Sequence, residues 1–321
     1  MEKLLDKRGR KIEYLRISVT DRCNLRCKYC MPEEGIKFKK HKDILRYEQI
    51  IKIVKTGKKL GIKKVRITGG EPLVRKDLSE LVAGLNNLNL EDISLTTNGI
   101  LFSEKAAELK EAGLDRVNIS LDTLKKDKYK KITRRDRFED VRSGIDAAFN
   151  FDFSPVKLNI VLMKGINDDE LLDFARLSID KPLHVRFIEY MPLGEEINGA
   201  EYYEMKKAKE EITKEFKLEN TQIKGNGPAN YYKISGSKGS IGFISPMSKH
   251  FCSGCNRFRL TADGKFRPCL ARDLEVKIPD DFSEESIIKA YKKSLSIKPI
   301  EHNLNFGDSD KRDRTMSQIG G

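Results

Sequence analysis

Short runs of alternating apolar and polar residues recur along the first two thirds of the chain. In the first run, Leu15, Ile17 and Val19 alternate with polar neighbours, and this period of two is typical of β-strands. Segments whose apolar positions lie three and four residues apart separate these runs and predict helices. The expected strands cover residues 12–19, 64–69, 92–97, 115–121, 156–162 and 184–190, and the expected helices cover 45–60, 77–88, 103–112, 137–150 and 168–179.

This strand–helix alternation predicts a parallel sheet, either open or closed into a barrel. Strands of such sheets are usually apolar on both faces, yet here one face is polar in five strands. The polar positions are Tyr14, Arg16 and Ser18; Lys64, Arg66 and Thr68; Asn118, Ser120 and Asp122; Lys157 and Asn159; and His184 and Arg186. Because helices should cover the apolar face, we expect the polar set to point inward. A closed barrel fills its interior with apolar side chains, so the pattern favours an incomplete (β/α)6 TIM-type barrel with a wide, wet lumen over an exposed edge sheet.

The pattern changes after about residue 200. A helix is expected over 201–217, followed by short strands near 229–234, 240–245 and 256–261. Gly and Pro residues separate these pieces and mark turns. We therefore expect a smaller α+β domain, with the chain divided at 1–215 and 216–321.

The charge balance narrows the class of partner. Of 321 residues, 35% are charged, and the net charge is +13. Solvated lysine faces account for part of this excess, and an anionic partner is the other interpretation. Because no nucleic-acid-binding signature accompanies the charge, a small anionic substrate is favoured over DNA or RNA. We find no signal peptide and no membrane-spanning run, so we expect a cytoplasmic protein with reduced thiols.

A first cysteine triplet follows the first expected strand, at Cys23, Cys27 and Cys30. In α/β barrels the carboxyl edge of the strands carries the chemistry. Thiolates are soft ligands for iron–sulfur clusters or zinc, and three of them leave one iron of a four-iron cube open. A structural zinc ion needs a fourth protein ligand, and the nearest histidine is His41. The triplet therefore predicts a [4Fe–4S] cluster.

A second triplet lies at Cys252, Cys255 and Cys269. Taken alone it is ambiguous, because His250 could complete a Cys3His zinc site. Beside a first open cluster, a second [4Fe–4S] cluster is favoured. Arg257 and Arg259 follow Cys255 on one face of a short strand, either as anion-binding groups or as a solvent-facing pair.

These motifs carry a family resemblance. Cys23, Cys27 and Cys30, with Tyr29 before the last cysteine, resemble the radical S-adenosylmethionine (SAM) signature, and Thr68-Gly69-Gly70-Glu71-Pro72 resembles the SAM-binding GGEP motif that ends the second strand. The second triplet with Asn256-Arg257 and Arg259, and the terminal Gly320-Gly321, resemble the GTP 3',8-cyclase family of molybdenum cofactor biosynthesis. The resemblance covers nearly the whole chain from Arg16 onward, and Gly194–Gly225 is its least distinctive part.

The resemblance implies roles for individual residues. GTP would be bound by residues of the polar strand faces and of the second motif, namely Arg16, Lys64, Arg66, Thr97, Lys157, Arg186, Arg257 and Arg259. SAM would be bound by Tyr29, Gly70, Ser120 and Met191, although Ser120 also fits a turn cap and Met191 fits core packing. The tail that ends in Gly320 and Gly321 would enter the barrel and complete the active site.

The resemblance also implies a reaction and partners. The first cluster would donate an electron to SAM, and the resulting radical would take the 3' hydrogen of GTP. The carbon radical would attack C8 of guanine, which the second cluster binds, to give (8S)-3',8-cyclo-7,8-dihydroguanosine 5'-triphosphate. An electron donor of the flavodoxin or ferredoxin type and a downstream pyranopterin-forming protein would be partners. The alternatives are a radical SAM enzyme that modifies a peptide, and a basic binding protein with structural zinc.

Overall fold

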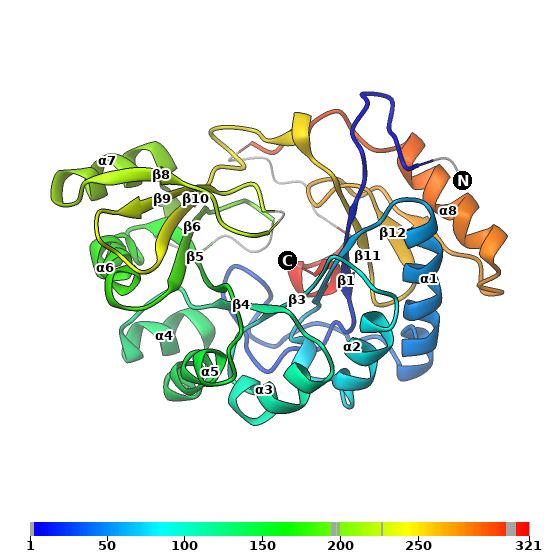
Figure 1. Cartoon of the computed structure of the whole chain (residues 1–321), viewed down its shortest axis with the longest axis horizontal. Coiled ribbons are helices and arrows are strands. Elements are labelled where there is room, and N and C mark those ends of the chain that lie inside the picture. Colours follow the sequence, from blue (N-terminus) through cyan, green and yellow to red (C-terminus); the bar gives the residue numbers. More distant parts are fainter. Residues whose placement is uncertain (1–2, 194–196, 198–199, 226, 306–312, 321) are drawn as a thin grey trace.

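One continuous sheet organises the protein. The computed structural model describes residues 3–193, 197, 200–225, 227–305 and 313–320. Within these residues the sheet has thirteen strands in the order β13-β12-β11-β1-β2-β3-β4-β5-β6-β10-β9-β8, and β7 pairs with β5. All pairs from β11 through β1–β6 to β10 are parallel. The order is linear, so the sheet curves without closing, and Figure 1 shows helices around its convex side.

The strands of the parallel part are short and lie where the alternation predicts them. They are β1 (Tyr14–Ser18), β2 (Lys64–Thr68), β3 (Asp92–Thr97), β4 (Arg116–Ser120), β5 (Val156–Lys164), β6 (Leu183–Glu189), β10 (Ser240–Ile244) and β11 (Arg257–Leu260). The remaining strands are β7 (Glu201–Tyr202), β8 (Leu218–Thr221), β9 (Asn230–Ile234), β12 (Lys265–Arg267) and β13 (Val276–Lys277).

The helices alternate with the strands of the barrel and continue beyond it. The α-helices are α1 (Tyr47–Lys59), α2 (Leu78–Asn86), α3 (Phe102–Glu111), α4 (Lys126–Thr133), α5 (Phe138–Asn150), α6 (Leu171–Asp180), α7 (Met205–Glu215), α8 (Glu284–Ser296) and α9 (Met316–Ile319). Short 3-10 turns lie at η1 (His41–Asp43), η2 (Pro72–Val74), η3 (Asp168–Glu170) and η4 (Cys252–Gly254).

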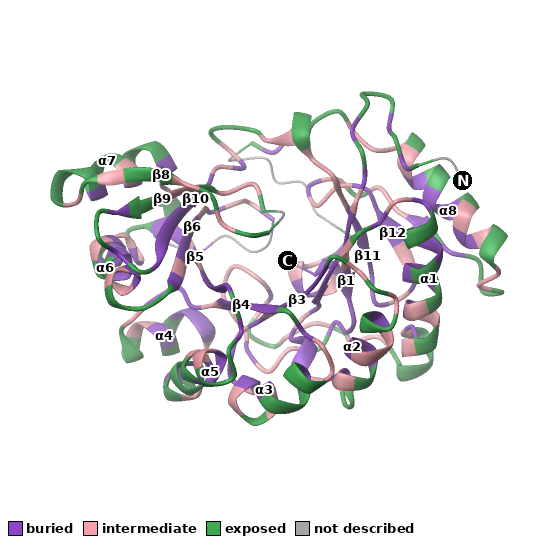
Figure 2. Cartoon of the chain, in the orientation of Figure 1, coloured by how far each residue is buried: buried purple, intermediate pink, exposed green. Residues whose placement is uncertain are grey.

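The two faces of the barrel strands differ as their sequence alternation predicts. Leu15, Val65 and Leu158 are fully buried in the core beneath the helices, and Figure 2 shows the burial that follows these strands. The alternate positions face the concave side, where a cavity lies between the strands and the segments that cover them. The predicted incomplete barrel with a polar interior is therefore confirmed.

The sequence after residue 216 contributes strands to both edges of the barrel. β11 pairs with β1, and β10 pairs with β6, both in parallel. Short antiparallel strands then continue each edge. The division into 1–215 and 216–321 stays a prediction.

Two expectations about helices need correction. The helix expected over 201–217 starts later, because Glu201–Tyr202 pair with β5 as strand β7 and the helix begins at Met205. Helices α4 and α8 were not predicted, because their dense lysines obscure the apolar period. No helix among the described residues has the length and apolarity needed to cross a membrane.

Candidate functional site

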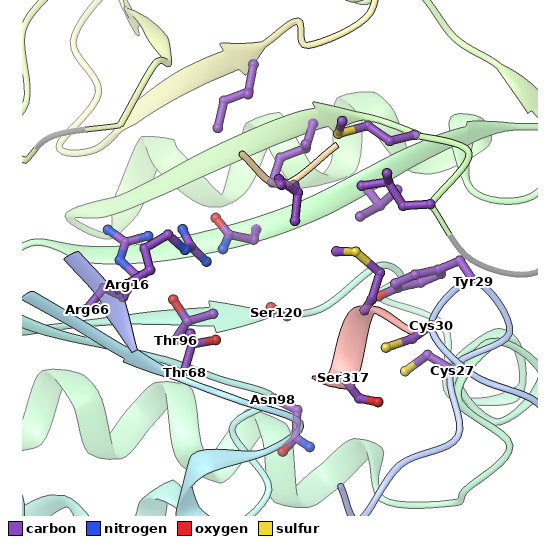
Figure 3. Close-up of a pocket in the computed structure, with 18 of the residues that line it drawn as sticks. Arg16, Cys27, Tyr29, Cys30, Arg66, Thr68, Thr96, Asn98, Ser120 and Ser317 are labelled. Carbon is purple, nitrogen blue, oxygen red and sulfur yellow. The ribbon is translucent and has the colours of Figure 1, made fainter. Parts of the chain in front are cut away.

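A cavity of about 320 Å³ lies on the concave side of the barrel. Cysteines of the first triplet line one end, and arginines line the other. Figure 3 shows Cys27, Cys30 and Tyr29 on one side of this space and Arg16 and Arg66 on the other. The fold therefore places a candidate metal-binding group and a cationic group in one cavity.

The first triplet lies on the loop after β1, and all three of its cysteines line the cavity. Burial raises the pKa of Cys23 to about 11, and the carboxylate of Glu71 adds to this shift. Burial also raises the pKa of Cys30 to about 12. Thiols with such pKa values stay protonated at neutral pH unless a metal holds them as thiolates. Three half-buried thiols on one loop, none of them in a disulfide, fit a [4Fe–4S] cluster with one open iron.

The Gly-Gly-Glu-Pro segment approaches this loop closely. A Cβ atom on Gly70 would lie 2.3 Å from the carbonyl oxygen of Arg22, so this position excludes any side chain. The following Glu71 is buried, and burial raises its pKa to about 7 despite the bonds that it accepts from Thr97 Oγ1 (2.7 Å) and Asn98 N (2.7 Å). At Gly70 the segment therefore presents backbone rather than a side chain to the cavity.

The cationic end is built by neighbouring strands in register. Arg16 of β1 is the Cα partner of Arg66 on β2 and of Arg259 on β11, so three arginines share one layer. Burial, together with the charge of Arg259, holds the pKa of Arg16 well below its usual range. Burial lowers the pKa of Arg66 to about 10 and that of Arg259 to about 9, with Arg257 adding to the second shift.

Such shifts follow from partial loss of solvent and from repulsion between neighbouring guanidinium groups. An anion placed among them would relieve both the repulsion and the lost solvation. Arg186, Arg257 and Thr97 also line this cavity, and the Thr97 hydroxyl donates to Glu71.

Two predicted substrate residues do not line this cavity. Lys64 lies at the amino end of β2, and its ammonium group is 3.5 Å from Glu91. Lys157 lies one layer below Asn159 on β5, lines a second cavity of about 540 Å³, and donates to the carbonyl of Lys224 (2.6 Å). Strand parity predicted the face of both side chains but not their depth along the barrel.

The four residues predicted to bind SAM all line the cavity. Tyr29 donates its hydroxyl to Asp122 (2.7 Å), which also accepts a bond from Val161 N (2.8 Å). Burial raises the pKa of Asp122 to about 6. Gly70, Ser120 and Met191 complete the set.

The second triplet lies just outside the lining residues, beside Arg257. Burial raises the pKa of Cys252, and Cys269 and Cys255 add to the shift because the three thiols are close. For Cys255, burial opposes ionisation, but Arg257 and Lys298 outweigh it and lower the pKa to about 6. The three soft donors and their cationic neighbours fit an anionic metal–thiolate group.

Two cations, the half-buried Lys298 and the buried Arg10, fix the backbone around this triplet. Lys298 donates to the carbonyls of Arg257 (3.0 Å) and Pro268 (2.8 Å), and its Nζ lies 3.7 Å from Cys255 Sγ. These bonds join the Cys252–Cys255 loop to the segment that carries Cys269. Arg10 donates to the carbonyl of Cys252 (2.8 Å) from the other side.

The zinc interpretation rests on a different donor set. Donor atoms of His250, Cys252 and His302 lie within 4.8 Å of one another. However, His302 Nε2 lies 2.9 Å from the carbonyl of Pro246, and its Nδ1 accepts from Leu304 N (3.3 Å). Because both ring nitrogens of His302 are engaged, this set fits a zinc ion less well than the cysteine triplet fits a cluster.

The chain's tail lies inside the barrel. Met316 and Ser317 of α9 line the cavity, and Arg259 donates to the carbonyl of Gly320. Arg314 anchors the segment through ion pairs with Asp263 (2.8 Å) and Glu275 (2.6 Å). The predicted tail, 316–321, thus reaches the cavity with Met316 and Ser317, whereas Gly321 lies outside the described residues, and the role of the tail in the active site stays a prediction.

One buried acid at the cavity, Glu189, was not predicted from the sequence. Glu189 ends β6 and accepts bonds from Tyr202 Oη (2.9 Å), Met247 N (2.8 Å) and Ser248 N (3.0 Å). It thereby ties the loop before Cys252 to the barrel. Strand parity gives no signal for this role, because Glu189 falls on the apolar side of the alternation.

Two family models match this chain in succession. The model of the radical SAM superfamily matches residues 17–178, and the model described as Molybdenum Cofactor Synthesis C matches residues 183–304. Among solved structures, SuiB of Streptococcus suis bound to S-adenosylmethionine is similar at a TM-score of 0.59 and 17% identity, over 90% of this chain and 66% of that chain. Native anSMEcpe with bound AdoMet has a TM-score of 0.56 at 17% identity, over 88% of this chain and 84% of that chain. These structures support the fold.

Curated relatives are similar over their entire length. The GTP 3',8-cyclase of Petrotoga mobilis is 53% identical over 99% of this chain and 100% of its own. The enzyme of the same name from Moorella thermoacetica is 51% identical over 97% of this chain and 98% of its own. Identity at this level over whole chains shows that the present chain belongs to the GTP 3',8-cyclase family of the radical SAM superfamily.

Proposed function

We propose that this chain cyclises GTP to (8S)-3',8-cyclo-7,8-dihydroguanosine 5'-triphosphate, the first step of molybdenum cofactor biosynthesis. One observation carries the proposal: a single cavity has three thiols at one end and buried arginines at the other. Membership of the radical SAM superfamily implies a [4Fe–4S] cluster and SAM. The two ends of the cavity then correspond to a radical source and a polyanion site.

Cys23, Cys27 and Cys30 hold the first cluster in this proposal, and the cavity residues Tyr29, Gly70, Ser120 and Met191 contact SAM. When bound and reduced, the cluster and SAM supply a carbon radical that can remove a hydrogen atom from a ribose. Gly70 suits close contact with an amino acid moiety because it exposes backbone. Asp122 holds Tyr29 in place through its 2.7 Å hydrogen bond.

The arginine end binds the triphosphate of GTP. A triphosphate carries about four negative charges, and arginine forks match phosphate oxygens in pairs. Arg16, Arg66, Arg186, Arg257 and Arg259 are the candidates that line the cavity, with Thr97 beside them. We retain Lys64 and Lys157 as weaker candidates because they lie outside it.

The net reaction breaks the C3'–H bond of GTP and joins C3' to C8 of guanine. The hydrogen atom leaves on SAM's adenosyl carbon, and the cyclised substrate radical takes one electron from the external donor and one proton from the solvent. The product is therefore an isomer of GTP. The buried walls and α9 exclude water from the reacting carbon.

We also propose a second [4Fe–4S] cluster at Cys252, Cys255 and Cys269. Its open iron would bind the guanine base next to Arg257. Residues 1–215 then supply the radical chemistry, and 216–321 supply much of the substrate site. Gly320 and Gly321 complete the cavity from the tail.

Two protein partners follow from this reaction. An electron donor of the flavodoxin or ferredoxin type reduces the first cluster, and a separate protein converts the product to a pyranopterin. Neither a nucleic acid nor a membrane is part of this proposal.

Anaerobic incubation with SAM, dithionite and GTP tests the function, with mass spectrometry of the products. We expect a GTP isomer that accumulates with 5'-deoxyadenosine, and about eight irons per chain, since each triplet can hold one cube. Replacing Cys252, Cys255 and Cys269 with Ala should leave about four irons. SAM cleavage with unchanged GTP would contradict the assigned substrate, and zinc without sulfide at the second triplet would contradict the second cluster.

A further inference from the structure

The proposed reaction needs two electrons from outside the chain at every turnover, one to cleave SAM and one for the cyclised substrate radical. The electron that cleaves SAM must reach the first triplet, whose cysteines line an interior cavity. The surface that backs the triplet's loop is therefore the place to look for a docking site. Helix α4 backs this loop, and a docking role for it rests on the proposed function.

Helix α4 is bonded directly to the loop that carries the first triplet. The amide of Lys28 donates to the carbonyl of Ile132 (3.0 Å), and the amide of Arg26 donates to the carbonyl of Thr133 (3.0 Å). Backbone bonds thus join the last turn of the helix to residues on either side of Cys27. An electron delivered at this helix therefore arrives beside the loop that carries the three cysteines.

The end of the helix is pinned to the same loop by a side chain. Arg134 follows α4 in a left-handed conformation, with φ of 56°. Its guanidinium donates to the carbonyls of Arg26 (3.2 Å) and Met31 (3.1 Å), which flank Cys27 and Cys30. On the inner face of α4, Tyr129 is buried in the hydrophobic core. The helix is therefore rigidly placed over the triplet.

The outer side of this helix is strongly basic. Residues 125–137 contain eight Lys and Arg residues against Asp127 and Asp136. Lys126, Lys130, Lys131 and Arg135 are exposed, and we call these four residues the α4 surface. Lys126 and Lys130 approach Asp136 only to 3.9 Å, and their side chains are 57% and 64% exposed. Figure 2 shows this helix buried on the side toward the sheet and exposed on the other.

We propose that the α4 surface docks an acidic one-electron carrier protein that reduces the first cluster. Redox encounter interfaces are small and weak, so complementary charge rather than buried area must bring the partners together. A basic surface fits an acidic carrier. Because helix α4 is bonded directly to the triplet's loop, a carrier that docks on the helix lies near the cluster rather than at a distant face.

Charge reversal on α4 tests the proposal, with purified flavodoxin and its reductase as the probe. The test variant is Lys130→Glu/Lys131→Glu. The matched control is Lys289→Glu/Lys293→Glu, which reverses two exposed lysines on α8, on the other side of the molecule in Figure 1. Three quantities are measured: flavodoxin binding, 5'-deoxyadenosine formation against flavodoxin concentration, and the same rate with dithionite.

We expect the α4 variant to need about tenfold more flavodoxin for half-maximal rate and to lose the salt dependence of binding. The dithionite-driven rate of the α4 variant should equal that of the parent, and the control variant should equal the parent in all three quantities.

The proposal is overturned if the α4 variant and the parent show the same flavodoxin dependence, or if the dithionite-driven rate of the α4 variant falls as much as its flavodoxin-driven rate. Loss of RNA binding with unchanged flavodoxin dependence would assign the surface to nucleic acid instead. Absence of a GTP isomer from the parent with dithionite would instead refute the function itself.

Discussion

At the scale of single residues, the buried arginines separate substrate binding from radical formation. We predict that Arg66→Met weakens GTP binding while SAM cleavage without GTP continues. Each lost charge-assisted hydrogen bond costs about 1.5–3 kcal/mol, which is about a 10- to 150-fold loss of affinity. Titration of the reconstituted protein with GTP measures the effect. Lys63→Met, at an exposed position directly before the same strand, is the matched control, and an equal loss there would contradict the cavity assignment.

Lys157 should take up a proton when GTP binds. Burial, followed by the charges of Arg186, Arg116 and Arg66, lowers its pKa from 10.5 to about 6, so the side chain is neutral at pH 8 in the substrate-free protein. A phosphate brought near restores the ammonium form. GTP binding should therefore take up protons at pH 8, and affinity should fall as pH rises above about 6. Calorimetry in buffers of different ionisation enthalpy measures the uptake. Equal proton exchange in Lys157→Met would refute this role.

Lys298 should tune the second cluster. Its ammonium lies 3.7 Å from Cys255 Sγ, and a positive charge near a thiolate-bound cluster stabilises the reduced form. We predict that Lys298→Met shifts the midpoint potential of that cluster to a more negative value, measured in a background that lacks the first triplet. Lys298→Arg should restore the parental value, and the exposed Lys293→Met should leave it unchanged. Unchanged potentials in Lys298→Met would make the residue merely structural.

Strand parity could predict which residues face the lumen, but not how deep each one lies. Arg16 and Arg66 were predicted correctly to face inward, because a period of two fixes the face of a strand. Lys64 shares that face with Arg66, yet it sits one layer lower and meets Glu91. The layer depends on the register between strands, which a single sequence does not encode locally.

At the scale of elements, the tail offers a test of close packing. Gly320 has φ of 70°, and a Cβ atom there would lie 2.7 Å from Thr68 Cγ2. We predict that Gly320→Ala dislodges α9 and lowers the yield of cyclised product per SAM consumed, with iron content unchanged. Gly236→Ala is the matched control, because Gly236 has a similar φ of 79° with nothing within 4 Å of its Cβ position. Equal yields in both variants would make the tail an ordinary chain end.

The elements of the barrel were largely predictable, and those that complete it were not. The six strand–helix units follow from local periodicity and breakers. The pairing of β11 with β1 joins segments more than two hundred residues apart, and that of β10 with β6 joins another pair distant in sequence. Such pairings depend on edge matching in three dimensions, which no local pattern of a short strand specifies.

At the scale of the whole molecule, the two triplets occupy different electrostatic environments. Carboxylates of Glu71 and Asp122 lie near the first triplet, whereas Arg257 and Lys298 lie near the second. Negative surroundings favour the oxidised form of a cluster and make its reduced form a stronger donor. This asymmetry fits a first cluster that donates electrons and a second that binds substrate.

The most direct test of the proposed reaction follows the hydrogen atom at C3' of GTP. GTP deuterated at C3' is incubated anaerobically with the reconstituted protein, SAM and dithionite, and both products are analysed by mass spectrometry. If the proposed reaction is correct, deuterium moves to 5'-deoxyadenosine, and the GTP isomer lacks it. The variant with Cys23, Cys27 and Cys30 replaced by Ala should form neither product. Unlabelled 5'-deoxyadenosine alongside GTP that keeps its deuterium would contradict the proposed reaction at its first bond-breaking step.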